Sequence, residues 1–401
     1  MNPAIAIKIK ELSERYYRQL QQWRHHLHRR PELSFDEHQT QQYLSGELAK
    51  LGIRDIQTVA GTGLLARLEG KNTDGKTLVL RADTDALPVN EENDIPYRSQ
   101  HPGIMHACGH DVHMTCLLGA ARILGEIRDH WHGTVLLLFQ PAEEKVPGGA
   151  KEIVEGDVLT PRHPDLILGQ HVDPTLGAGT VGYRPGRYMA SSDELYLTIT
   201  GHGGHAALPG KVTNTPYIAA QILIRMVDLV AQEAPDDTPS VLRFGRVEAP
   251  GATNVIPDTV HMEGTFRTFD ETWRNRVHEK ITAMAKNLAE QNGAEAGLEI
   301  RKGYPVLEND PAATSKAINF SAEYLGEEKI RHLDRRMTSE DFAYYSRVAP
   351  SLFFRLGVSP PGVRTIYPLH SPRFDIHEPV LATGAGHLAW LTYSFLQEER
   401  R

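Results

Sequence analysis

The chain has 401 residues, of which 40% are hydrophobic, 23% charged and 7% aromatic, a composition typical of a soluble globular protein with one or two domains. The formal net charge of −8 disfavours a nucleic-acid or anionic-membrane partner. Every apolar run is too short to span a bilayer, and two cysteines are too few for a disulfide framework, so we expect a reduced, cytoplasmic protein.

The first half of the chain predicts an α/β domain. Apolar residues at spacings of three and four between positions 12 and 27 indicate an N-terminal helix, which Pro31 ends. Four short apolar runs with strand character follow: TGLLARLEG, KTLVLRADTDALP, GTVLLLFQPAEE and PDLILGQHVDP. A helix is expected between the second and third, at about 110–127. Nearly continuous apolar strands separated by helices predict a mostly parallel sheet covered by helices.

A different pattern begins near residue 187. Here DELYLTITG, NTPYIAAQILIRMVDLVAQEA, SVLRFGRVEA, TVHMEGTFRTF, DETWRNRVHEK and AEAGLEIRKGYPVL indicate the order β-α-β-β-α-β. That order is the ferredoxin-like unit. The α/β pattern returns at about residue 305 with the apolar strand SLFFRLG. We therefore expect an α/β domain of residues 1–186 and 305–401 and an inserted α+β domain of residues 187–304.

Three of the predicted strands end in residues that bind metals. KTLVL leads into Asp83 and Asp85, TVLLLF into Glu143 and Glu144, and LILG into His171. Ligands bind at the carboxyl ends of the strands in open parallel sheets, so these residues should converge. The motif HACGHDVH, residues 106–113, lies just before the expected helix on the same edge.

The residue types at this edge favour a metal centre. Zinc and related ions take thiolate, imidazole and carboxylate ligands, and Cys108 and His110 can reach one site from a glycine-containing turn. Of the adjacent Glu143 and Glu144, one can bind metal while the other serves as a general base. Four or five ligands beside a free carboxylate favour two metals with a bridging water as the nucleophile.

Other roles for Cys108 are less favoured by its surroundings. A disulfide with Cys116 is disfavoured, because eight residues of helix separate two positions by about 12 Å. A nucleophilic Cys108 paired with a histidine remains open, although it leaves the carboxylates and His171 unexplained. A polar loop with capping histidines is the third alternative.

A set of motifs resembles a known enzyme family. RRPELSFDE, RADTDALP, MHACGHDVHMT, QPAEE, GHGGHAALP, TNVIP, GTFRT, SEDFAYY and LHSPRF occur in this order between about residues 24 and 380. The chain thereby resembles the amidohydrolase branch of the aminoacylase/carboxypeptidase metallopeptidases. This branch includes hippurate hydrolase, indole-acetyl-amino-acid hydrolases and N-acetyl-diaminopimelate deacetylase. Thr84 stands where methionine is usual and His377 where an acidic residue is common, and neither is a proposed ligand.

The resemblance implies a catalytic domain that holds two divalent metal ions, with zinc preferred and manganese, cobalt or nickel as alternatives. The implied metal ligands are Cys108, His110, Glu144, His171 and His370. Glu143 is then the general base, and Asp85, with Asp83, orients the ligands.

The inserted domain is then a lid that makes a homodimer. His205 is expected to reach the neighbouring subunit's site and to stabilise the oxyanion. Asn254 and Arg267 are expected to hold the carboxylate of the substrate, and an arginine fork suits that group.

The function implied is metal-dependent hydrolysis of the amide bond of N-acyl amino acids, such as N-acetyl or N-benzoyl conjugates, through a bridging water that Glu143 activates. One alternative is a metallo-dipeptidase or carboxypeptidase that acts on peptides. A more remote alternative is a non-catalytic binding homologue, against which the presence of Glu143 and all five ligand residues argues.

Overall fold

The computed structural model describes residues 2–208, 210–362 and 367–398. The chain forms two compact units. Unit 1 comprises Met1–Gly186, Glu308–Asp334 and Asp341–Arg401, and unit 2 comprises Arg187–Leu307 and Arg335–Glu340. The sequence predicts domain boundaries at residues 186/187 and 304/305. Unit 2 differs in also containing the short segment Arg335–Glu340, which that prediction places in the α/β domain.

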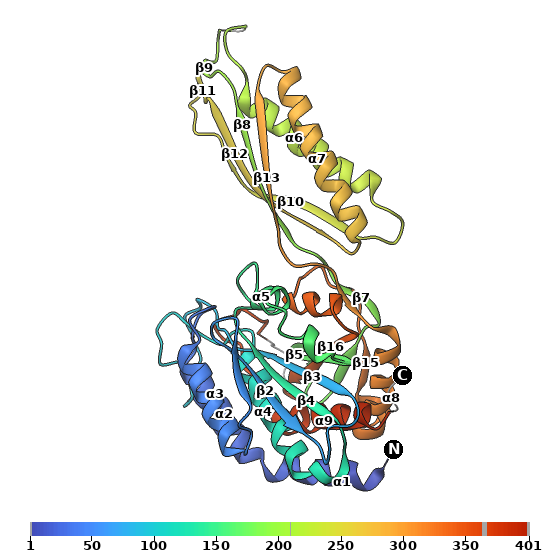
Figure 1. The fold of residues 1–401 in the computed structure, drawn as a ribbon. Coiled ribbons are helices and arrows are strands. Elements are labelled where there is room, and N and C mark those ends of the chain that lie inside the picture. The colour runs from blue at the N-terminus through green and yellow to red at the C-terminus, as the bar shows by residue number, and fades with distance from the viewer. Residues whose placement is uncertain (1, 209, 363–366, 399–401) are drawn as a thin grey trace. The chain divides into compact units, whose positions relative to one another are not determined.

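Unit 1 is built on an eight-stranded sheet in the order β1-β2-β4-β3-β5-β16-β6-β15 (Figure 1). The strands are β1 Ile56–Val59, β2 Gly63–Glu69, β3 Thr77–Asp83, β4 Thr134–Gln140, β5 Leu166–Gly177, β6 Val181–Tyr183, β15 Ile330–His332 and β16 Ser351–Ser359. The neighbours β4, β3, β5 and β16 run parallel, which confirms the mostly parallel sheet. Strand β2 pairs antiparallel with β4, as its alternating Arg67 and Glu69 befit.

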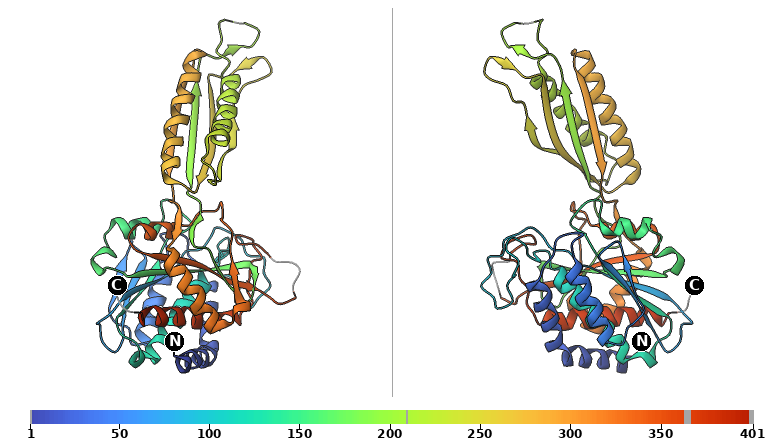
Figure 2. Two further views of the ribbon diagram at one scale, coloured as in Figure 1. Left: turned by 90° about the vertical axis from the view of Figure 1, so that its right-hand side faces the viewer. Right: turned by 60° about the vertical axis from the view of Figure 1, so that its left-hand side comes forward.

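Helices flank this sheet (Figure 2). They are α1 Pro3–Arg15, α2 Tyr17–Arg29, α3 His38–Lys50, α4 His110–Glu126, α5 Gly149–Glu155, α8 Pro311–Leu325 and α9 Val380–Leu396, with 3-10 turns at Arg128–His130, Thr160–Arg162, Glu327–Lys329 and Asp341–Arg347. The single N-terminal helix expected from sequence is two helices, because Tyr16 takes φ −89° and ψ 1° and interrupts the repeat.

The core of unit 1 lies between the sheet and the layer formed by α4 and α9. Leu78, Leu80 and Ala82 of β3 face these helices and are buried. The intervening Arg81 points to the opposite face, toward the 3-10 turn at Asp341–Arg347, and Asp83 at the end of β3 contacts both Arg81 and His113 of α4. The apolar side of the sheet therefore holds the strands rigid, while its other side carries polar groups.

Unit 2 is the ferredoxin-like unit predicted from sequence. Its elements are β8 Asp193–Thr200, α6 Thr215–Glu233, β10 Ser240–Glu248, β12 Thr259–Thr268, α7 Glu271–Gln291 and β13 Glu295–Lys302. They form an antiparallel sheet in the order β10-β12-β8-β13. Leu195, Leu197 and Ile199 alternate along β8 and pack against both helices. The short strands are β9 Gly204–His205 and β11 Val255–Ile256, which pair with each other, and β7 Gly186–Met189 and β14 Leu307–Asn309, which do likewise.

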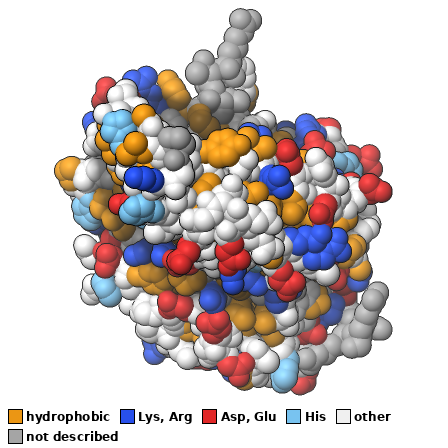
Figure 3. All heavy atoms as spheres, turned by 90° about the horizontal axis from the view of Figure 1, so that it is seen from above, with side chains coloured by type: hydrophobic (Ala, Val, Ile, Leu, Met, Phe, Trp, Pro, Cys, Tyr) orange, Lys and Arg blue, Asp and Glu red, His pale blue; other side chains and the backbone are white. Residues whose placement is uncertain are grey.

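The surface carries charges of both signs. On the face drawn in Figure 3, acidic and basic side chains are interspersed rather than gathered by sign. Among the helices of the described ranges, none combines the length and apolar character that crossing a bilayer requires.

Candidate metal centre and active site

Six residues singled out from sequence lie close together in unit 1. Cys108 and His110 come from the start of α4, Glu143 and Glu144 follow β4, His171 lies on β5, and His370 comes from a turn before α9. The Sγ atom of Cys108 lies 3.5 Å from Nε2 of His171. Glu144 Oε1 lies 3.4 Å from Nε2 of His370 and 3.9 Å from Nε2 of His110.

These side chains form overlapping groups with metal-ligand geometry. Cys108, His110 and His171 make one group, and Cys108, Glu144 and His370 make another. The ligand atoms within each group lie within 4.8 Å of one another. Because Cys108 belongs to both groups, the arrangement suits two adjacent cations better than a single one.

The hydrogen bonds leave the expected ligand atoms available. Nδ1 of His110 lies 2.8 Å from the backbone oxygen of Asp85, and Nδ1 of His171 lies 2.7 Å from that of Val172. His110 Nε2 and Glu144 Oε1 are buried and have no hydrogen-bond partner among the described residues. Buried polar atoms are normally paired, so these two atoms, which face each other, fit a bound cation.

Electrostatics at the site also fit a cation. Burial, together with Arg355 and His113, holds the pKa of His171 well below its usual value, so this imidazole is neutral, as a ligand must be. Burial opposes protonation of His110, but Asp83 and Asp85 outweigh it and raise the pKa of His110 to about 10. In the metal-free protein a proton on His110 thus supplies the positive charge that the carboxylates attract.

The same surroundings disfavour a nucleophilic cysteine. Burial, followed by the charges of Glu144 and Glu143, raises the pKa of the Cys108 thiol well above its ordinary value. Reactive thiols have lowered pKa values, whereas a bound divalent cation stabilises the thiolate directly. Of the alternatives left open by the sequence, the metal ligand is therefore the one that these surroundings favour.

Asp85 organises the carboxylate pair. Its Oδ1 accepts a hydrogen bond from the Glu143 amide at 3.0 Å, and its Oδ2 accepts one from the Glu144 amide at 3.0 Å. Ala142, immediately before the pair, has a φ of 53°, and its amide donates to Glu37 Oε1 at 2.8 Å. The strained turn and its two buried carboxylates fix the direction in which the glutamates leave β4.

His370 is held by backbone rather than by regular secondary structure. Its φ of 66° lies in the left-handed region, and its amide donates to the Ala107 carbonyl at 2.9 Å. This bond brings His370 beside Cys108 although the two are far apart in sequence. Strain in a non-glycine residue at such a position is typical of functional sites.

Comparison with known proteins agrees with this geometry. The family described as peptidase family M20/M25/M40 matches residues 79–392. The chain belongs to this family.

Three relatives match between 76% and 96% of this chain. An N-acetyl-L-cysteine deacetylase of Bacillus subtilis is 36% identical over 89% of this chain and 83% of its own length. An N-acyl-L-amino acid amidohydrolase of Geobacillus stearothermophilus is 38% identical over 76% of this chain and 81% of its own. The crystal structure of the Bacillus subtilis YXEP protein, described as a dinuclear metal binding peptidase from the M20 family, has a TM-score of 0.82 and 32% identity, and the match covers 96% of this chain and 99% of that one.

The predicted family and enzyme class are therefore confirmed: the chain is a metal-dependent amidohydrolase of the M20 family, and its structural relative YXEP is described as a dinuclear metal binding peptidase. The identity of the metal, the substrate and the roles of individual residues stay predictions.

In unit 2 of this M20 chain, two of the predicted residues lie together and the third lies apart. His205 pairs with Val255 across β9 and β11, and the Ala206 amide donates to the Asn254 carbonyl at 3.0 Å. Arg267 lies near the other end of β12, eight residues beyond Thr259, which corresponds to about 26 Å along a strand. Arg267 donates to the Met337 carbonyl at 3.2 Å. Asn254 and Arg267 of one chain therefore cannot both grip one carboxylate.

Sequence reasoning predicts Asp83 as a supporting group but misses the buried arginine network around it, beneath the candidate metal site. Arg81 donates to Asp83 at 2.6 Å and to Asp341 at 2.8 Å. Asp83 in turn lies 2.6 Å from Nδ1 of His113, whose Nε2 accepts from the Val172 amide at 2.9 Å. Both nitrogens of His113 are thus engaged, and its role is to support β5 beside His171. The motif SEDFAYY contains Asp341 and was the available signal.

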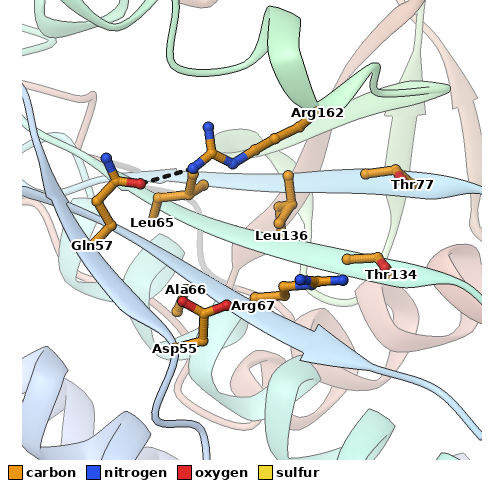
Figure 4. Close-up of a pocket in the computed structure, with 9 residues that line it drawn as sticks. All are labelled: Asp55, Gln57, Leu65, Ala66, Arg67, Thr77, Thr134, Leu136 and Arg162. Atoms are coloured by element: carbon orange, nitrogen blue, oxygen red, sulfur yellow. Dashed lines mark hydrogen bonds between the residues drawn. The ribbon is translucent and has the colours of Figure 1, made fainter. Parts of the chain in front are cut away.

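A hollow of about 270 Å³ in unit 1 is lined by none of the candidate ligand residues (Figure 4). Thr77 and Thr134 line it at the starts of β3 and β4, whereas the metal site lies beyond the other ends of these strands. Its Arg162 is engaged by Gln57 at 2.8 Å. The convergence of candidate ligand residues, rather than the hollow, therefore marks the candidate active site.

Proposed function

We propose that the protein hydrolyses the amide bond of N-acyl amino acids and releases a carboxylate and a free amino acid. The observation that carries the proposal is the position of Glu143. Its carboxylate groups with His110 and Glu144 in ligand geometry, yet it lies outside the two groups that share Cys108. A carboxylate beside a metal centre that is not needed as a ligand suits a general base.

The residues divide the work in a simple way. Divalent cations held by Cys108, His110, Glu144, His171 and His370 would acidify a water molecule and polarise the substrate carbonyl. Glu143 removes the proton of the attacking water and then delivers it to the nitrogen of the leaving amine. The bonds from Asp85 to the Glu143 and Glu144 amides hold both carboxylates in place during these transfers.

Zinc is the metal we propose, because a thiolate and three imidazoles suit it. Manganese, cobalt or nickel are the alternatives, since metal availability also decides occupancy. A reduced cytoplasmic setting, expected from the cysteine count, keeps Cys108 available as a ligand.

The separation between the two ends of unit 2 supports a homodimer with a shared site. His205 and Asn254 are exposed at one end, while Arg267 is half-buried at the other. If Arg267 serves the site of its own chain, His205 and Asn254 serve the site of the partner. His205 then stabilises the oxyanion, a contribution of about 3–4 kcal/mol for a well-placed donor, and Asn254 and Arg267 hold the substrate carboxylate from two chains.

An apolar stripe offers a surface for this association. Tyr217 and Ile224 on α6 are each 56% exposed, and Val227 continues their line at helical spacing. Exposed apolar residues at such a spacing suit a helix partner, here a second copy of this chain.

The names of the relatives support the substrate class. One is named for an N-acyl-L-amino acid and another for N-acetyl-L-cysteine, so both names specify an acylated amino group. The peptidase description of the YXEP protein favours the second candidate, a dipeptidase or carboxypeptidase within the same metal framework.

A substrate panel tests the proposal. The purified protein, stripped of metal and reloaded separately with zinc, manganese, cobalt and nickel, is assayed on N-acetyl and N-benzoyl amino acids and on dipeptides with a free amino group. We expect turnover of the acylated substrates only. Turnover of the dipeptides alone would replace the proposal with the peptidase, and no turnover by a metal-loaded protein would favour the non-catalytic homologue.

A complementation test addresses the shared site. Mixed dimers of His205→Ala and Glu143→Gln chains contain one site with both residues intact, so they should regain part of the activity that each parent lacks. Verified mixed dimers without activity would contradict donation of His205 across the interface.

A further inference from the structure

The buried guanidinium of Arg24 lies between the chain segment that carries His110 and the segment that carries His370. Arg24 is on α2 and is 1% exposed. Its Nε donates to Asp111 Oδ2 at 3.1 Å, and its Nη2 donates to Asp375 Oδ1 at 2.6 Å. Asp111 follows His110 directly, and Asp375 lies five residues after His370.

The remaining contacts of Arg24 reinforce this bridge. Its Nη1 donates to Glu378 at 3.2 Å, and Tyr97 donates to the second oxygen of Asp375 at 2.9 Å. His28, one turn further along α2, lies 2.9 Å from the same oxygen of Asp111 that Arg24 contacts. Each carboxylate therefore has a second partner, and the fork of Arg24 is the group that touches both.

The two bridged segments differ in how firmly they are held otherwise. Asp111 belongs to α4, whose backbone is fixed by helical hydrogen bonds against the core. The segment from His370 to Asp375 has neither helix nor strand. The His370 amide links it to Ala107, and the Pro372 and Phe374 carbonyls accept bonds from the Glu92 amide at 2.8 Å and the Asn93 side chain at 3.1 Å. These bonds come from loops, so loss of the Arg24 bridge would loosen the His370 segment more than the helical Asp111 segment.

Stability alone does not explain this cluster. Burying a guanidinium with carboxylates costs desolvation that often cancels the attraction, and apolar replacements of similar size are frequently as stable. The fork has the geometry to fix two carboxylates at a set separation. The cluster is therefore better explained by the need to hold Asp111 and Asp375 at a fixed separation than by a gain in stability.

We propose that Arg24 is a positioning residue that sets the distance between the His110 and His370 segments and thereby the affinity for the second of two divalent cations. The inference rests on the proposed metal centre. The cation bound through Glu144 and His370 depends on the bridge, whereas the cation bound through His110 and His171 does not.

Calorimetric titration of metal-free protein with zinc, together with measurement of bound metal per chain, tests this proposal without a substrate. In Arg24→Lys the charge remains but one lysine cannot reach both carboxylates in a fork. We expect two binding events, of which the weaker has a dissociation constant raised about 10- to 100-fold, while the tighter is unchanged. Excess zinc should restore the second ion.

Two further variants complete the design. Asp375→Asn breaks the bridge on the His370 side only and should weaken the second zinc-binding event to the same extent. This variant tests the proposal if Arg24→Lys does not fold. Arg274→Lys is the matched control, because Arg274 is a buried arginine that binds Asp193 in unit 2, and both binding events should remain.

Wild-type affinity for both ions in Arg24→Lys and Asp375→Asn would overturn the proposal, as would equal weakening of both events in all three variants. If wild-type protein binds two ions but hydrolyses no acylated amino acid, the substrate proposal fails while this inference stands. If wild-type protein binds fewer than two ions, the dinuclear premise fails first.

Discussion

Replacing Asp85 by asparagine should show how much Asp85 contributes to stability and metal affinity while every proposed metal ligand stays in place. The Asp85 carboxylate accepts the amides of Glu143 and Glu144, each at 3.0 Å, and the Ser34 hydroxyl at 2.6 Å. Although burial raises the pKa of Asp85, the bonds to His110, Ser34 and the Glu144 amide lower it overall, so the group is ionised. Asparagine has nearly the same shape but only one accepting oxygen.

The magnitude follows from these contacts. In Asp85→Asn one backbone amide meets an NH₂ group in place of an oxygen and becomes a buried donor without a partner. That loss costs about 1–3 kcal/mol, and the weaker neutral bond that remains adds about 1 kcal/mol. We expect the free energy of unfolding to fall by about 3 kcal/mol and the metal affinity to fall about 10- to 100-fold.

Denaturant unfolding of metal-free protein and calorimetric metal titration measure the two effects. Asp310→Asn is the matched control, because Asp310 caps α8 by accepting the Ala313 amide at 2.7 Å and asparagine caps helices equally well. The control should change neither quantity by more than about 0.5 kcal/mol. Unaltered metal affinity in a folded Asp85→Asn protein would refute the supporting role.

Three other predictions concern the same region. Gly109 has a φ of 83°, and an added Cβ would lie 2.5 Å from Val172, so Gly109→Ala should lower the unfolding free energy by about 1–2 kcal/mol or more and reduce metal occupancy; thermal unfolding and metal analysis check this. Cys108→Ser should lose affinity for both cations, because Cys108 belongs to both ligand groups, whereas a metal-replete inactive variant would indicate a nucleophile. Burial opposes protonation of His28, but Asp111 outweighs it and raises the pKa of His28 to about 9 from an ordinary 6.5. The stability that protonated His28 contributes is therefore complete below pH 6.5 and is lost as the pH rises through 9, by at most about 1.4 kcal/mol per pH unit. The His28→Asn variant should lack this decline in the free energy of unfolding, and a pH profile identical to that of the wild type would contradict the assignment.

The sequence predicted the parts of the site that follow from local pattern and sheet topology. Asp83, Glu143 and His171 converge because β3, β4 and β5 run parallel and end at one edge. Cys108 and His110 lie beside them because the turn that carries them begins α4.

The parts that local pattern does not predict depend on contacts between distant segments. His370 is expected only from the family resemblance, because it enters the site through a left-handed turn and a backbone bond to Ala107, and no periodicity marks such a turn. The pairing of Arg24 with Asp375, and of Arg81 with Asp341, joins residues hundreds of positions apart. Charged residues in a sequence indicate solvent exposure by default, so their burial follows only from the assembled fold.

The antiparallel start of the sheet is a related case. The run TGLLARLEG is grouped by its apolar residues with the parallel strands, yet β2, which also carries Arg67 and Glu69, pairs antiparallel with β4. A short apolar run specifies a strand without specifying its direction, which the connections to its neighbours decide.

The most direct test of the central claim is the Glu143→Gln variant, measured for bound metal and for hydrolysis of N-acyl amino acids in the same preparation. Glutamine preserves the side-chain shape, and the backbone amides of residues 143 and 144 can still donate hydrogen bonds to Asp85. Glutamine cannot, however, accept the proton of the attacking water. The account predicts two cations per chain, as in the wild type, with turnover reduced at least about 100-fold. Wild-type turnover in a metal-loaded Glu143→Gln protein would contradict it.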